Sequence, residues 1–98
     1  MNTYKHKFNS RCPNNNLVIR YKLKIEASFM VQVEHIVTAC GLHASAYHED
    51  IAKAVHLRFG GRVTLRAHHH GVDILTVLGE PDQPAAKVVF VSTAPVVE

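Results

Sequence analysis

A chain of 98 residues can form one small domain, and its 47% hydrophobic residues exclude an intrinsically disordered protein. The formal net charge is +3, and eight histidines add positive charge as the pH falls below about 6.5. This charge permits a phosphate-bearing ligand or a nucleic acid. However, the lysines and arginines are spread through strand-like segments rather than gathered in one stripe, so neither is assigned as a partner. We expect homo-oligomerisation to add burial, because so short a chain buries only about two-thirds of its unfolded surface.

The sequence predicts a cytoplasmic protein with no membrane partner. Lys5 and Lys7 are not followed by the apolar run that a signal peptide or a membrane span would need. Cys12 and Cys40 lack the spacing of paired metal ligands, and in a reducing compartment both would be thiols. One of them can serve chemistry and the other packing.

Two strands are expected in the first 27 residues. Residues 3–8 alternate in polarity, and residues 17–27 do so more clearly. The apolar face of the second strand should consist of Leu17, Ile19, Tyr21, Leu23 and Ile25. Pro13 and three asparagines give the clearest loop signal in the chain. Cys12 should therefore lie in a hairpin connection, where side chains are free to do chemistry.

Two helices should follow. Residues 30–40 fit a strand by their β-branched residues and a helix by their apolar spacing, and we favour a helix that Gly41 caps. The second helix should run from an N-cap at Ser45 to Phe59, before two stop-signal glycines. Its buried stripe should consist of Tyr47, Ile51, Ala54, Val55 and Phe59. Glu49 and Asp50 in its first turn suit the positive end of the helix dipole.

The remaining residues predict a second strand pair and a tail. Residues 62–68 and 72–78 alternate as strands around a turn near His70, and residues 81–86 form a loop before a last strand at 87–93. The fold class is therefore α+β: an antiparallel sheet in ββααββ order with two helices on one face, plus a C-terminal strand. We expect a single domain over residues 1–98, with a core at about 3–79 and an extension at 80–98.

Three consecutive histidines invite a zinc interpretation. Successive side chains on a strand point to opposite faces, so at most His68 and His70 share a face, and a third ligand such as His48 would be needed. We predict a solvated hairpin tip here, and no metal site.

Four short motifs occur in a suggestive order. They are F-x-S-x-Cys-Pro at residues 8–13, Val-Glu at 33–34, aromatic-His-Glu-Asp at 47–50 and Gly-Val-Asp-Ile at 71–74. This order resembles the 7-cyano-7-deazaguanine reductases and the related archaeal amidinotransferases of the queuosine and archaeosine pathways. Both have the tunnelling fold (T-fold), whose ββααββ order is the one expected above. The match spans roughly residues 6–79.

The resemblance implies roles for four residues. Cys12 and His48 would be catalytic: Cys12 attacks a nitrile carbon to form a thioimide, a task suited to a thiolate, and His48 lies beside the substrate. Glu49 would bind the guanidine-like edge of a purine- or pterin-like base, because a carboxylate accepts two N–H donors. Glu34 corresponds to the glutamate that opens the first helix, and it is the second expected ligand-binding residue.

The sequence departs from the reductases at three places. Ile19 stands seven residues after the cysteine, where the reductases carry a proton-donating Asp. Residues 14–18 replace their TGQPD-like sequence, and residues 35–38 replace a Ser-Lys-Ser-Leu-Lys run. These departures remove the acid and much of the nicotinamide cofactor surface, so no cofactor is assigned. The amidinotransferases need no such cofactor, but they also carry the Asp.

Two other functions fit parts of the chain. A catalytically silent relative would keep the fold for a binding or structural role. An enzyme, in contrast, needs Cys12 to be exposed and close to Glu49 across a subunit interface. Residues 41–44, followed by a helix, also resemble the histidine-containing phosphocarriers, in which His43 would accept a phosphoryl group at a helix N-terminus. That alternative requires residues 30–38 to form a strand.

Overall fold

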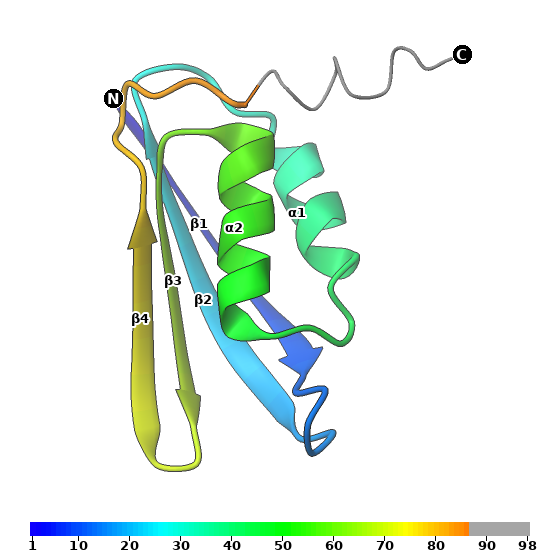
Figure 1. Ribbon diagram of the computed structural model, residues 1–98. Coiled ribbons are helices and arrows are strands. Elements are labelled where there is room, and N and C mark those ends of the chain that lie inside the picture. Colours follow the sequence, from blue (N-terminus) through cyan, green and yellow to red (C-terminus); the bar gives the residue numbers. More distant parts are fainter. Residues whose placement is uncertain (87–98) are drawn as a thin grey trace, which may run out of the picture.

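The computed structural model describes residues 1–86, and the strand predicted at 87–93 lies outside the described residues. Its six elements follow the predicted ββααββ order (Figure 1). They are β1 (Asn2–Arg11), β2 (Val18–Ala27), α1 (Val33–Gly41), α2 (His48–Phe59), β3 (Arg62–His69) and β4 (Val72–Leu78). Among the described residues, no helix is long and apolar enough to cross a membrane.

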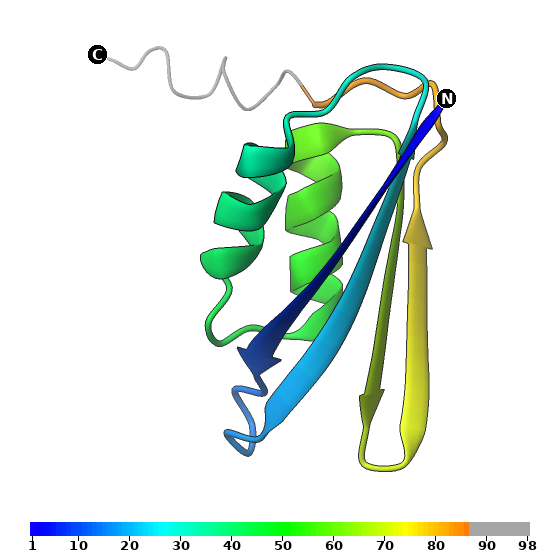
Figure 2. The ribbon, with the colours of Figure 1, turned by 180° about the vertical axis from the view of Figure 1, so that it is seen from behind.

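The four strands form one antiparallel sheet in the order β1-β2-β3-β4. Both helices cover the same face, and within residues 1–86 no helix covers the opposite face (Figures 1 and 2). β1 and β2 are paired residue by residue from Asn2↔Ala27 to Arg11↔Val18. Because this pairing continues to the hairpin turn, β1 extends to Arg11, three residues beyond its predicted end.

The core lies between the helices and the sheet. Alternate side chains of β2 and β3 point towards α2, and Ile25, Val63 and Leu65 are fully buried there against Ile51 and Val55. The predicted α2 stripe is therefore largely confirmed: Ile51, Val55 and Phe59 are buried and Ala54 is partly buried. Burial of these apolar side chains supplies the main stabilisation of so small a domain.

The element ends differ from the predictions. Tyr47 is the N-cap of α2 and is 53% exposed, so it is not part of the buried stripe. Ser45 is not the N-cap, because it forms a β-bridge with Arg11 instead. Leu17 lies in the hairpin turn before β2 and is 49% exposed. Gly41 ends α1 as its last residue, and the C-cap is Leu42.

Two glycines end α2 as predicted. Gly60 and Gly61 have φ angles of +69° and +71°, which residues with a side chain rarely adopt. A Cβ on Gly61 would lie 2.7 Å from the Glu26 carbonyl oxygen, so this position also needs the close approach that only glycine permits. The pair thus turns the chain from α2 directly into β3.

Candidate functional site

Main-chain hydrogen bonds hold the start of α2 beside the β1–β2 turn. The Arg11 N–H donates to the Ala44 carbonyl over 2.9 Å, and the Ala46 N–H donates to the Arg11 carbonyl over 3.2 Å. Arg11 is the last residue of β1 and Cys12 follows it. The segment that leads into α2 therefore runs alongside the residue before Cys12. Two regions distant in sequence, both predicted to carry site residues, are adjacent within a single chain.

A row of rings links the sheet to α2. Phe8 of β1 and Tyr21 of β2 are cross-strand partners with ring centroids 5.2 Å apart, and the Tyr21 ring lies 5.5 Å from that of His48. Offset aromatic pairs at these distances are favourable beyond their buried area. His48 is therefore held by packing, although sequence analysis assigned it a role only through the resemblance.

Several polar atoms under the start of α2 have no partner. Within residues 1–86, Ser10 Oγ, the Tyr21 hydroxyl and both His48 ring nitrogens are buried without a hydrogen bond. Ser10 and Tyr21 are 2% and 1% exposed, and they are diagonal neighbours on the inner face of the β1–β2 pair. Each unpaired buried group costs about 1–3 kcal/mol, so such a concentration calls for a functional explanation. We call Ser10, Cys12, Tyr21 and His48 the buried polar cluster.

The environment keeps His48 and Tyr21 neutral. Burial lowers the pKa of His48 below its usual 6.5, and this shift is opposed in part by the Leu65 main chain and the Glu49 carboxylate, although neither ring nitrogen attains hydrogen-bond geometry. Burial, and then the neighbouring Cys12 sulfur, raises the pKa of Tyr21. At neutral pH, His48 thus presents one donor and one acceptor nitrogen, and Tyr21 presents a hydroxyl.

Cys12 does not match its predicted surroundings. Its side chain is 8% exposed and belongs to the hydrophobic core, whereas the hairpin connection was expected to leave it exposed. The reason is a tight turn: the Cys12 N–H donates to the Leu17 carbonyl over 2.9 Å, and its carbonyl accepts from the Asn16 N–H over 2.7 Å. This turn directs the side chain inwards. A ligand can reach the sulfur only if residues that cover it move.

The two predicted ligand-binding glutamates lie apart. Glu49 is exposed in the first turn of α2, next to His48. Glu34 is exposed in the first turn of α1, and α1 runs antiparallel to α2, so the two acids lie at opposite ends of the helix layer (Figure 1). Ile19, at the place of the missing acid, is 6% exposed in β2 and supplies no proton donor. One chain thus unites Cys12, His48 and the start of α2 without Glu34.

His43, His68 and His70 lie outside the buried polar cluster. His43 lies in the connection between α1 and α2, five residues before α2 begins, and residues 33–41 are a helix. The phosphocarrier alternative is therefore wrong, because it needs a strand there and a histidine at a helix start. His68 Nδ1 lies 2.8 Å from Asp73 Oδ1, and His70 Nε2 lies 2.9 Å from Asn15 Nδ2 around the β3–β4 hairpin. Residues 1–86 contain no group of three His, Cys, Asp or Glu side chains placed to hold a metal ion.

Two members of the cluster were not predicted from the sequence as functional residues. Ser10 was noted only within a motif, and Tyr21 was counted as a core position of β2. A usable signal was present, since Tyr21 is the only polar residue on the inner face of β2, which is otherwise made of isoleucine, leucine and alanine. What the sequence could not show is that its hydroxyl lacks a partner.

The fold of this chain is similar to that of a known protein structure. No family model and no curated protein matches the chain. Its architecture is the α+β tunnelling fold, as predicted, because a solved structure of that fold superimposes on most of it. That structure is the apo form of the archaeosine synthase QueF-like, with a TM-score of 0.62 over 85% of this chain and 95% of the other. The identity is 17%, so the similarity concerns the fold.

Proposed function

We propose that this chain binds a planar heterocycle of the 7-deazaguanine, purine or pterin type between the buried polar cluster and the first turn of α2. The observation that carries the proposal is the set of unpartnered atoms on Ser10, Tyr21 and His48 beside that turn. Ring nitrogens and exocyclic groups of such a ligand offer the missing donors and acceptors. The resemblance to deazaguanine enzymes and the shared fold with an archaeosine synthase support the ligand class.

Two residues in the first turn of α2 have separate roles in this proposal. Glu49 accepts two N–H donors from the guanidine-like edge, and a charge-assisted pair of this kind is worth more than a neutral one. His48, neutral through burial, hydrogen-bonds the ring beside it. Glu34 belongs to the opposite end of the helix layer, so it contributes only from a neighbouring copy. We therefore include a homo-oligomer in the proposal. In the described part of the chain, β1 and β4 are the edge strands of the sheet, and Val72, Leu75 and Val77 are exposed on β4.

The proposal extends to a covalent step on a nitrile ligand. The Cys12 thiol passes its proton to His48, and the sulfur forms a bond to the nitrile carbon as one C–N π bond breaks. The nitrile nitrogen then takes that proton from His48, which returns to its neutral form. The product is a thioimide, and no oxidant or reductant is consumed. Residues that cover the sulfur must move for this step.

A binding protein without this chemistry is the second candidate. Two observations favour it: Cys12 is 8% exposed, and Ile19 fills the place of the proton donor. In that case the polar cluster still binds the heterocycle, and Cys12 serves as a packing residue.

Calorimetric titration with 7-cyano-7-deazaguanine tests the binding proposal. Replacing Glu49 by Gln removes a charge-assisted pair worth about 1.5–3 kcal/mol, so the affinity should fall by about 10-fold to 100-fold. The matched control is Asp50→Asn, which removes one negative charge from the same exposed turn and should leave the affinity within about twofold. No binding to the wild type, or equal losses in both variants, would refute the assigned site.

Intact-protein mass spectrometry separates the two candidates. Wild-type protein incubated with the same nitrile should gain the full mass of the ligand, and Cys12→Ala should gain nothing. An unmodified wild-type protein that still binds in calorimetry would establish the binding candidate. An adduct on Cys12→Ala would place the chemistry at another residue.

A further inference from the structure

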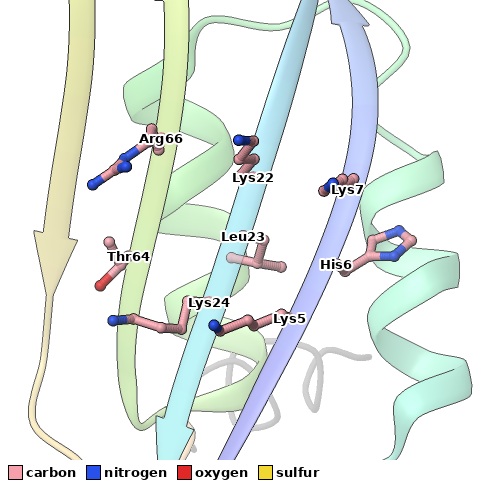
Figure 3. A pocket seen from close by; sticks show the side chains of 8 residues that line it. All are labelled: Lys5, His6, Lys7, Lys22, Leu23, Lys24, Thr64 and Arg66. Atoms are coloured by element: carbon pink, nitrogen blue, oxygen red, sulfur yellow. The ribbon is translucent and has the colours of Figure 1, made fainter.

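The basic residues gather on the sheet face that carries no helix. Residues of β1, β2 and β3 whose side chains point away from the helices include eight of the 11 lysines and arginines: Lys5, Lys7, Arg11, Arg20, Lys22, Lys24, Arg62 and Arg66. Figure 3 shows the central part of this face, with cationic side chains from all three strands. The expectation that these residues are spread out is therefore wrong, because strand pairing places them side by side. We call Lys5, Lys7, Lys22, Lys24 and Arg66 the basic sheet face.

Its cations stand directly opposite one another. The register pairs Lys5 with Lys24, Lys7 with Lys22, and Lys22 again with Arg66. Like charges in directly opposite positions destabilise a sheet. Three such pairs on adjoining strands therefore carry an electrostatic cost that a bound anion would relieve.

Acidic residues compensate little of this charge. Glu26 Oε1 lies 3.8 Å from Lys24 Nζ at one end of the face, where it also contacts Arg62 at 3.4 Å. Among the described residues, Lys5, Lys7, Lys22 and Arg66 form no ion pair. The charge of four of the five cations on this face is thus uncompensated, in a protein whose whole formal charge is only +3.

The face also has the shape of a binding surface. The five cations, with His6, Leu23 and Thr64, line an open hollow of about 560 Å³. Neighbouring strands lie about 4.8 Å apart, and alternate residues of one strand about 6.7 Å apart, so the cations form a regular grid. The hollow contains no Phe, Tyr or Trp on which a base could stack, so it offers contacts to charge rather than to rings.

We propose that the basic sheet face binds a phosphate-bearing polyanion through its phosphate groups. Lysines act as point charges towards successive phosphates, Arg66 offers a planar fork for bidentate contact, and the Thr64 hydroxyl adds a hydrogen bond. The same phosphate chemistry occurs in a small polyphosphate and in a nucleic-acid backbone. This site lies on the opposite side of the sheet from the heterocycle site and does not depend on it.

The test uses two probes at low ionic strength. One is a fluorescein-labelled single-stranded oligonucleotide of mixed sequence followed by anisotropy, and the other is inorganic tripolyphosphate followed by calorimetry. The variant is the double substitution Lys5→Gln with Lys22→Gln, and the control is Lys53→Gln. Lys53 is exposed on α2, on the other side of the molecule, so its substitution should leave binding of either probe unchanged.

The wild type should bind at least one probe, and the double variant should bind it at least 10-fold more weakly. For the oligonucleotide, the slope of log K against log salt should fall by about 1.4, because each single-strand phosphate contact contributes about 0.7. Binding of the oligonucleotide but not tripolyphosphate identifies a nucleic-acid backbone, and the reverse identifies a small polyphosphate. The melting temperature of the double variant should equal or exceed that of the wild type, because all three like-charge pairs are relieved. Failure of both probes to bind, or an equal loss in Lys53→Gln, would overturn the proposal.

Discussion

The Tyr21 hydroxyl provides a direct test of the buried polar cluster. The side chain is 1% exposed and its hydroxyl has no hydrogen-bond partner in residues 1–86. Tyr21→Phe keeps the ring that packs against Phe8 and His48 and removes only the unpaired oxygen. An unsatisfied buried group costs about 1–3 kcal/mol, so we expect the ligand-free variant to be more stable by about 1 kcal/mol. For a domain of this size, that is a rise of about 4–8 °C in melting temperature.

The same substitution should weaken ligand binding, so stability and function should move in opposite directions. Urea unfolding followed by circular dichroism measures the first quantity, and calorimetric titration with 7-cyano-7-deazaguanine measures the second. A loss of stability of about 1 kcal/mol or more in Tyr21→Phe would show that the hydroxyl already has a partner in the free protein. The polar atoms of the cluster would then be hydrogen-bonded within the protein, and the cluster would not be a ligand-binding site.

Tyr4→Phe is the matched control. The Tyr4 hydroxyl accepts a hydrogen bond from the Val31 N–H over 3.0 Å, and it is also within 3.0 Å of Asn2 Nδ2. Removing it leaves the Val31 N–H without that partner, so the variant should lose about 1 kcal/mol of stability. The two substitutions delete the same atom from neighbouring strands and should change the free energy of unfolding with opposite signs.

Three further predictions concern the rest of the domain. Gly61→Ala should destabilise it by about 2 kcal/mol in urea unfolding, because φ is +71° and the new Cβ meets a carbonyl oxygen. In contrast, the new Cβ of Gly41→Ala in α1 meets nothing within 4 Å, so this substitution should stabilise the domain by about 0.5–1 kcal/mol. Because burial lowers the pKa of His48 below 6.5, its imidazole binds a proton more tightly in the unfolded chain than in the folded one. The stability contributed by neutral His48 is therefore complete above about pH 6.5 and is lost as the pH falls through the folded-state pKa. In thermal melts from pH 8 down to about pH 5, the melting temperature should decline less in His48→Gln than in the wild type. Burial raises the pKa of Cys40 to about 11, so iodoacetamide at pH 8 should label Cys40 in urea but not in the folded protein. Peptide mapping measures the labelling. Labelling of the folded protein would mean that α1 opens locally.

The order and type of the elements could be predicted largely because β2, β3 and α2 each bury one face. Alternation in residues 17–27 and helical spacing from Ile51 to Phe59 follow directly from burial on one side, and the structure has both. The ends could not be predicted so well. Ser45 pairs with Arg11 through the main chain, and this tertiary contact displaced it from the cap position that its type favours.

The site was only partly predictable for a similar reason. The resemblance directed attention to Cys12, His48 and Glu49, and the chain does bring the start of α2 beside the residue before Cys12. The burial of Cys12 was not predictable, because it depends on how the turn to Leu17 closes. The basic sheet face was missed because the sequence pattern places charges on one side of each strand but does not give the register between strands.

A crystal structure of the protein with 7-cyano-7-deazaguanine tests the central claim most directly. The account predicts the ring beside His48 and Tyr21, with the guanidine-like edge on Glu49 and ligand atoms hydrogen-bonded to polar groups that are unpaired in the free protein. Continuous density from the ligand to the Cys12 sulfur would add the covalent step. A ligand bound elsewhere, with Ser10, Tyr21 and His48 unchanged, would contradict the account.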